Sequence, residues 1–161
     1  RAAANRIREE IVASAWNEAV GSFVSAYGGH DLDGSLLQIA GLRMLPAEDQ
    51  RLRRTIDAVW QDLARGGWLM RYRTDDGFGS PTVAFILCTF WLVEALATVG
   101  RTAEARALLE RARSALSPLG LLSEDYEVEG LRMWGNFPQA YSHVGLINAA
   151  FAVSPPWSDV L

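Results

Sequence analysis

The residues best suited to chemistry are four carboxylates within six positions: Glu124, Asp125, Glu127 and Glu129. Neighbouring carboxyl groups can divide acid and base work when their surroundings hold one protonated and the other ionised. The plain alternative is a solvated acidic loop, since acidic residues are mostly exposed. Apolar and aromatic side chains accompany these acids: Leu121, Leu122, Tyr126, Trp134 and Phe137. Such neighbours desolvate carboxylates and shift their pKa values, and this mixture suits a sugar, which presents C–H faces and hydroxyls.

A second polar segment begins with Arg71 and Tyr72 and continues to Asp75, Asp76 and Gly77. The planar donors of Arg71 can bind vicinal hydroxyls, although a surface ion pair is the simpler role. Asp-Asp-Gly by itself is an ordinary turn sequence. Neither signal identifies a site without the acidic segment.

Several kinds of chemistry are excluded by composition. All 15 basic residues are arginine, so no lysine is present for a Schiff base or a P-loop. One cysteine, Cys88, rules out an internal disulfide and a cysteine-rich zinc site. His30 and His143 lie far apart without a metal-binding spacing, and the sequence predicts no metal and no cofactor.

Charge and hydropathy predict neither a nucleic-acid nor a membrane partner. The net charge is −4, which disfavours binding to phosphates. The longest apolar run, 83–93, is too short to span a bilayer. Charges at Arg6, Arg8, Glu9 and Glu10 interrupt any early apolar stretch, so we expect no signal peptide and a cytoplasmic location.

Some aromatic and polar residues have an open role. Trp68 and Trp134 lie in predicted loops, where they could either stack on a sugar or pack structurally. His143 fits a hydrogen-bonded structural role better than catalysis, and Cys88 fits a buried core position.

Helical periodicity runs through nearly the whole chain, and no convincing strand competes with it. Six helices are expected. The first ends at Gly21, and the other five run from Asp33 through Ala40, from after Pro46 to Gly66, from about Thr82 to Gly100, from Thr102 to about Ser117, and from Pro138 towards Val153.

The connections between these helices alternate between short and long. Links near 45–46 and 100–101 are short, whereas 21–32, 66–81 and 118–137 are long. Antiparallel neighbours would bring the long links to one end, where loops usually hold a site. The pattern favours a stretch of an α/α toroid over a bundle or a helical-repeat array.

Six runs carry a resemblance to a known family: 21–27 (GSFVSAY), 32–37 (LDGSLL), 71–73 (RYR), 85–96 (FILCTFWLVEAL), 120–126 (GLLSEDY) and 135–147 (GNFPQAYSHVGLI). The chain resembles glycoside hydrolase family fifteen, which includes glucoamylases and bacterial trehalases. The resemblance implies an all-α, six-helix portion of an (α/α)6 toroid, half of the complete twelve-helix domain. Residues 1–161 would be the C-terminal part of that single catalytic domain.

The resemblance also implies inverting hydrolysis of a terminal α-glucosidic bond. In the family, the base lies in the Ser-Glu motif that matches Glu124, and the sugar-binding arginine matches Arg71. Tyr72, Asp75, Asp76 and Trp134 are further candidates for substrate binding. Asp125 stands where the family usually has a second glutamate. The family's general acid lies upstream of Arg1, so this chain would supply the base without the acid.

Two consequences concern partners and alternatives. Six helices of twelve would leave apolar surface uncovered, so we expect association with the missing half or with another copy. The alternative function is a non-catalytic helical scaffold or binding fragment, because 102–116 resembles one helix of a tetratricopeptide pair. No 34-residue period recurs in the sequence, which counts against that alternative.

Overall fold

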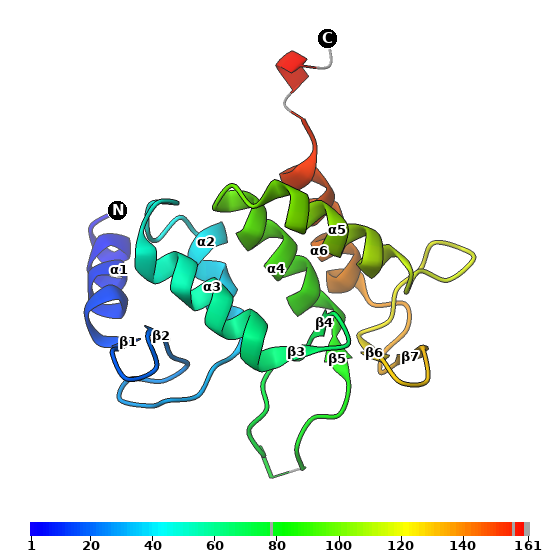
Figure 1. Ribbon diagram of the computed structural model, residues 1–161, viewed down its shortest axis with the longest axis horizontal. Helices are drawn as coiled ribbons and strands as arrows, with labels where there is room; N and C mark the ends of the chain where they lie inside the picture. The colour runs from blue at the N-terminus through cyan, green and yellow to red at the C-terminus, as the bar shows by residue number, and fades with distance from the viewer. Residues whose placement is uncertain (78, 156, 160–161) are drawn as a thin grey trace.

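A computed structural model describes residues 1–77, 79–155 and 157–159. Within these residues the chain is mainly helical, as expected (Figure 1). The α-helices are α1 (Ala2–Ser14), α2 (Gln38–Gly41), α3 (Gln50–Leu63), α4 (Ile86–Thr98), α5 (Thr102–Arg113) and α6 (Ala140–Val153). Two 3₁₀ helices accompany them, η1 (Gly34–Leu37) directly before α2 and η2 (Trp157–Asp159) beyond α6.

Helix α3 illustrates how the sequence determines a helix. Asp49 is its N-cap, and the carboxylate accepts a hydrogen bond from the backbone N–H of Arg51 at 2.8 Å. Its apolar residues recur at helical spacing and are buried: Leu52, Ile56, Val59 and Leu63. The opposite face is polar, so α3 covers the core from outside.

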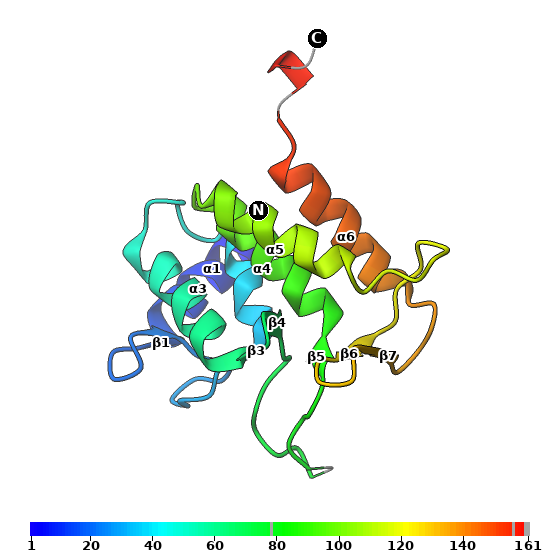
Figure 2. The same ribbon diagram turned by 45° about the vertical axis from the view of Figure 1, so that its right-hand side comes forward.

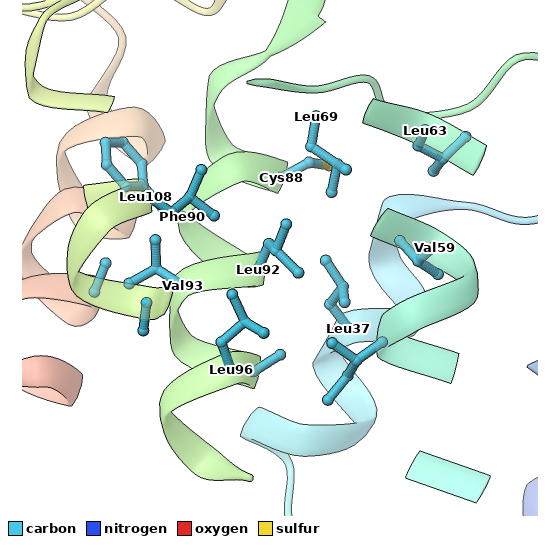
Figure 3. Packing of buried hydrophobic residues seen from close by; sticks show 14 of the residues in the cluster. Leu37, Val59, Leu63, Leu69, Cys88, Phe90, Leu92, Val93, Leu96 and Leu108 are labelled. Carbon is cyan, nitrogen blue, oxygen red and sulfur yellow. The ribbon is translucent and has the colours of Figure 1, made fainter. Parts of the chain in front are cut away.

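Helix α4 forms the centre of the core. Its buried residues lie on nearly all sides of the helix, as its apolar sequence predicts. Figure 3 shows Leu92 and Leu96 of α4 near Leu37, with Val59 and Leu63 of α3 beyond, and Phe90 and Val93 near Leu108 of α5. Cys88 is fully buried beside Leu69, which confirms its expected core position.

Close approach of α6 to α4 depends on Gly145. A Cβ atom at this position would lie 2.8 Å from Cδ1 of Leu87 and 3.0 Å from Cδ2 of Phe90. The small residue therefore allows the two helix backbones to pack closely, and Ala149 continues the buried side of α6.

The expectation that no strand competes with the helices is wrong, because short antiparallel strands close the loops. They are β1 (Trp16–Asn17), β2 (Ser22–Phe23), β3 (Ala64–Arg65), β4 (Trp68–Leu69), β5 (Ala84–Phe85), β6 (Asp125–Glu127) and β7 (Arg132–Trp134). β1 pairs with β2 and β3 with β4, while β5, β6 and β7 form one small sheet in that order.

Three of the expected helices are shorter in the structure, the first two of them because strands adjoin them. The first helix ends at Ser14 instead of continuing to Gly21, because Trp16 pairs with Phe23 across the β1–β2 hairpin. The fourth begins at Ile86 instead of Thr82, because Ala84 pairs with Tyr126 of β6. The fifth ends at Arg113, before the expected position near Ser117.

All the long connections lie at one end of the helices, as expected (Figures 1 and 2). The β1–β2 hairpin, the 24–33 loop, the described residues after β4 and the β6–β7 hairpin lie along this end, and β6 pairs with β5 directly before the N-terminus of α4. The short α4–α5 connection turns at the opposite end. The fold therefore brings the polar loop segments to one face.

No helix among the described residues is both long and apolar enough to cross a membrane.

Candidate functional site

The three-stranded sheet fixes the backbone of Glu124. The residue immediately precedes β6, which pairs with β5 on one side and β7 on the other. Its carbonyl accepts from the backbone N–H of Ile86 at 3.1 Å, and its N–H donates to the carbonyl of Asn136 at 2.9 Å. Glu124 is thus held between the first turn of α4 and the segment after β7.

The carboxylate of Glu124 has hydrogen-bond donors on both oxygens. The phenol of Tyr141, on the first turn of α6, donates to Oε1. Asn136 donates to Oε2 twice, from Nδ2 at 2.7 Å and from its backbone N–H at 3.1 Å. The bond from Tyr141, followed by the backbone bond from Asn136, lowers the pKa of Glu124 below its ordinary value. The group is therefore an oriented, ionised carboxylate.

The neighbouring Asp125 has the opposite protonation behaviour. Burial, followed by the negative charge of Glu124, raises the pKa of Asp125 to about 6. Adjacent carboxyl groups whose pKa values are pushed apart are typical of sites that handle protons. The pKa of Tyr141 is also raised, first by burial and then by its hydrogen bond to Glu124, so the phenol keeps its proton as a donor.

Gly135 brings the β7 backbone against this pair of carboxyl groups. Its φ is +73°, in the left-handed region that favours glycine. A Cβ atom there would lie 2.9 Å from Oδ2 of Asp125 and 3.0 Å from Oε2 of Glu124. The absence of a side chain is a condition for the hydrogen bonds from Asn136 to Glu124.

Trp134 stands beside the pair on strand β7. It is opposite Asp125 in the β6–β7 register, and the residue is 53% exposed. The guanidinium of Arg132 lies 5.5 Å from its ring centroid. The ring is therefore open to solvent at the end of the molecule that carries Glu124.

Arg71 lies in the loop that follows β4. Both oxygens of Asp33 lie 3.1 Å from its Nε atom, so the two side chains form an ion pair. The backbone also joins the two segments, because the N–H of Gly34 donates to the carbonyl of Arg71 at 2.7 Å.

The other candidates of this loop form a second cluster. The phenol of Tyr72 donates to Oδ2 of Asp76 at 2.6 Å, which raises the pKa of Tyr72. Asp75 accepts backbone N–H bonds from Gly77 at 2.8 Å and Gly79 at 3.1 Å, the turn role that its sequence predicts. A cavity of about 280 Å³ is lined by Ser25, Asp31, Leu32, Asp33, Tyr72, Thr74, Asp75 and Asp76.

Cys88 is buried in the first turn of α4, close to charged groups from both loop segments. Burial raises the pKa of the Cys88 thiol, the charge of Arg71 lowers it, and those of Asp33 and Asp125 raise it further. All three charged groups are thus close enough to Cys88 to affect its ionisation. The fold brings Arg71 and the Glu124–Asp125 pair to the same region from positions about 50 residues apart in the sequence.

Two open roles are decided by burial and hydrogen bonds. Trp68 is buried in β4 and packs against Tyr126, with ring centroids 4.4 Å apart, so it cannot stack on a sugar. His143 is structural: its Nδ1 lies 2.8 Å from the carbonyl of Gln139, and its Nε2 accepts from the N–H of Leu122.

Three residues of the site were missed as functional candidates. Asn136 and Tyr141 appear in the sequence only as members of a family-like run, although they hold Glu124. Asp33 is recognisable as a helix start, and it does accept from the N–H of Ser35 at 2.7 Å, but its pairing with Arg71 leaves no local signal. Among the described residues, no cluster of three or more His, Cys, Asp or Glu side chains could hold a metal ion.

The chain is similar in sequence to known glycoside hydrolases. A sequence model of Glycosyl hydrolases family 15 matches residues 1–151. A trehalase of Mycobacterium tuberculosis is 41% identical over 156 residues, covering 95% of this chain and 23% of the trehalase. A trehalase of Thermoplasma volcanium is 35% identical over 147 residues, covering 91% of this chain and 24% of the trehalase. The chain therefore spans about a quarter of the length of these curated relatives.

Solved structures of glycosidases have a similar fold. A wild-type glycosidase superposes with a TM-score of 0.79 and 26% identity, over 94% of this chain and 43% of the glycosidase. A variant of a glycosidase in complex with glucose gives the same values. These neighbours are of the (α/α)6 type, which confirms that the six helices are a portion of such a toroid. The fold, the ordered motifs and the extent of the match together show that this chain belongs to glycosyl hydrolase family 15.

Proposed function

We propose that the complete enzyme hydrolyses a terminal α-glucosidic bond with inversion, and that Glu124 is its general base. The observation that carries this proposal is the Glu124 carboxylate, ionised and oriented by Tyr141 and Asn136. The three protein hydrogen bonds leave a lone pair on Oε1, which can accept a proton from water. The likeness to family 15 and to trehalases supports the reaction class.

In an inverting reaction, one carboxylic acid protonates the leaving oxygen while a carboxylate takes a proton from the attacking water. The water oxygen then bonds to the anomeric carbon on the face opposite the departing group. We assign the second role to Glu124. The acid belongs to the part of the enzyme outside this chain, as the family resemblance implies.

We assign sugar binding to Arg71, Tyr72, Asp75, Asp76 and Trp134. Arg71 has a 44% exposed side chain and supplies hydroxyl donors, and Trp134, opposite Asp125 in the β6–β7 register, supplies an exposed ring. Tyr72, Asp75 and Asp76 line the adjacent cavity of about 280 Å³. Because the curated relatives are trehalases, we favour trehalose over a starch-derived oligosaccharide as the substrate.

Helix α6 carries an exposed apolar surface that a further part of the protein could cover. Val144, Ile147 and Phe151 recur on one side of α6 and are each more than half exposed. We propose that this stripe packs against the remaining helices of the toroid, since the chain covers 43% of its structural neighbours. Residues 1–161 would then be the C-terminal part of one catalytic domain. The lone, buried thiol of Cys88 fits a cytoplasmic location.

Anomeric analysis of the products tests the reaction. Proton NMR of the complete enzyme with trehalose should show equal early amounts of α- and β-glucose, because only the attacked residue inverts. Early release of α-glucose alone would indicate retention and contradict the proposed role of Glu124. Cleavage of maltotriose but not trehalose would change the assignment to a glucoamylase, and absence of any release would favour a binding fragment.

The base assignment predicts a specific effect of Glu124→Gln. This variant keeps the size of the side chain but cannot take up the proton, so turnover should fall by about 100-fold or more while sugar binding is retained. Kinetics and calorimetric sugar titration measure the two effects. Glu127→Gln is the matched control, because Glu127 lies three residues further on, at the end of β6, and pairs with Arg132 at the surface. Wild-type turnover in Glu124→Gln would show that another group is the base.

A further inference from the structure

Among the described residues, the side chain of Arg71 donates from one of its five N–H groups, the one at Nε. Both oxygens of Asp33 lie 3.1 Å from Nε, on the inner part of the guanidinium. In the part of the chain that the structure describes, no hydrogen bond engages Nη1 or Nη2 of Arg71. Four N–H groups in a single plane therefore remain available to a ligand.

Asp33 is itself firmly held. Its side chain is 14% exposed, against 44% for Arg71. Its Oδ1 also accepts from the N–H of Ser35 at 2.7 Å, which closes the start of η1. The next residue, Gly34, donates its N–H to the carbonyl of Arg71 at 2.7 Å. A partly buried acceptor on a hydrogen-bonded turn thus holds the end of a long, exposed side chain.

Gly34 shows how closely this turn fits the core. A Cβ atom at Gly34 would lie 2.5 Å from Sγ of Cys88 and 3.5 Å from the carbonyl oxygen of Arg71. The turn therefore packs directly on α4, and the position of Asp33 is set by the core rather than by solvent. Exposed ion pairs add little to stability, so this arrangement serves to place a charge more than to stabilise the fold.

We propose that Asp33 is the positioning residue of Arg71: by holding Nε, it fixes the guanidinium plane so that Nη1 and Nη2 receive vicinal hydroxyls of the bound hexose. The proposal rests on the sugar-binding role of Arg71 given above. A free arginine rotates among many conformers, whereas one anchored at Nε presents its two outer nitrogens in a defined direction. Loss of the anchor therefore weakens sugar binding without removing the arginine.

A matched control separates positioning from helix capping. Asp49 also caps a helix, and it also pairs with an arginine, because its carboxylate accepts from the N–H and side chain of Arg51. This second Asp–Arg pair lies at the start of α3, among residues with no assigned role in the site. Asp33→Asn and Asp49→Asn each keep an oxygen for capping and remove the charge.

The test is glucose binding to the complete enzyme, measured by calorimetry for Asp33→Asn, Arg71→Ala, the double variant and Asp49→Asn. We expect Asp33→Asn to weaken glucose binding about tenfold, roughly 1.4 kcal/mol, and Asp49→Asn to leave it unchanged. In the Arg71→Ala background, Asp33→Asn should cause no further loss, because Asp33 acts through Arg71. Additive losses, or unchanged affinity in Asp33→Asn, would overturn the proposal.

A second measurement does not depend on a variant that must fold. In wild-type protein labelled with nitrogen-15, slow rotation of the Arg71 guanidinium would give a protected Nε–H signal and separate Nη signals. A freely rotating guanidinium would contradict the anchoring. A failure of the proposed function would look different. If the complete enzyme cleaved no glucoside but Asp33→Asn and Arg71→Ala each lost glucose affinity, Asp33 would still be the positioning residue of a glucose-binding site.

Discussion

Glu124 and Asp125 show how far two adjacent carboxyl groups can differ when, in the described part of the chain, only Glu124 accepts side-chain hydrogen bonds. Glu124 receives hydrogen bonds from Tyr141 and Asn136, which favour its charged form. Asp125 lies on the first residue of β6, half-buried and next to that charge, which disfavours its own ionisation. The sequence predicts that apolar neighbours shift the pKa values here, but the donors that decide the direction lie beyond the β6–β7 hairpin.

The raised pKa of Asp125 predicts a pH-dependent cost to folding. Unfolded, the group titrates near 3.8, whereas in the folded protein it titrates near 6. Between these pH values the folded state binds the additional proton, so stability falls as pH rises through this range. Replacement by Asn removes the charge, so Asp125→Asn should be more stable than wild type by about 1–2 kcal/mol above pH 6 and gain nothing below pH 4, after allowance for solvent screening.

Urea unfolding of both proteins across this pH range measures the difference. Asp31→Asn, at an exposed loop position, controls for the general effect of removing one negative charge. A constant difference between wild type and Asp125→Asn at all pH values would show that Asp125 titrates normally in the folded state.

At the scale of elements, the sequence predicts the long helices but not the short strands. Helices such as α3 and α4 can be predicted from the sequence, because burial requires apolar residues at helical spacing over many positions. Strands of two or three residues, such as Trp16–Asn17, are too short for alternation to be recognised. They form because backbone groups beside buried loops need hydrogen-bond partners, a requirement that composition does not reveal.

The distinction between local and long-range signals also explains which site residues could be predicted from the sequence. Glu124 stands in a distinctive motif, so its importance could be predicted from the sequence. Its partner Tyr141 is 17 residues away on α6, and Asp33 is 38 residues from Arg71. The Glu124–Tyr141 and Arg71–Asp33 pairs form only when the long loops come together at one end of α4. The spacing of these residues along the chain therefore does not predict them.

The β6–β7 hairpin yields a prediction about backbone geometry. Gly135 and Gly120 have nearly equal φ values, +73° and +74°, so alanine is strained by about 1 kcal/mol at either position. A Cβ atom at Gly120 meets nothing within 4 Å, whereas one at Gly135 meets both carboxyl groups. We therefore expect Gly135→Ala to lose about 1–3 kcal/mol more stability than Gly120→Ala in urea unfolding.

Turnover of the complete enzyme gives the second readout for this pair. Gly135→Ala should reduce it strongly, since Glu124 must move away from Asn136, and Gly120→Ala should leave it near wild type. Equal stability and equal turnover of the two variants would show that the backbone at Gly135 does not position the carboxylates.

At the scale of the whole molecule, the helical array has two unequal ends. Helix α1 lies at one end and buries none of its residues, while α6 at the other presents an apolar stripe (Figure 1). The buried side of α6, which includes Gly145 and Ala149, packs against the core. The toroid continues in the structural neighbours, which are more than twice as long as the matched region. The stripe is the surface that such a continuation would cover.

Without that continuation, copies of this chain should associate through the stripe, because large exposed apolar patches are unfavourable in water. Sedimentation velocity over a concentration series should show association of the wild-type chain. A triple variant with serine at Val144, Ile147 and Phe151 should sediment as a monomer with unchanged helicity. The matched control places serine at three other exposed leucines, Leu42, Leu119 and Leu131, and should still associate. A wild-type chain that stays monomeric at every concentration would contradict the stripe as a contact surface.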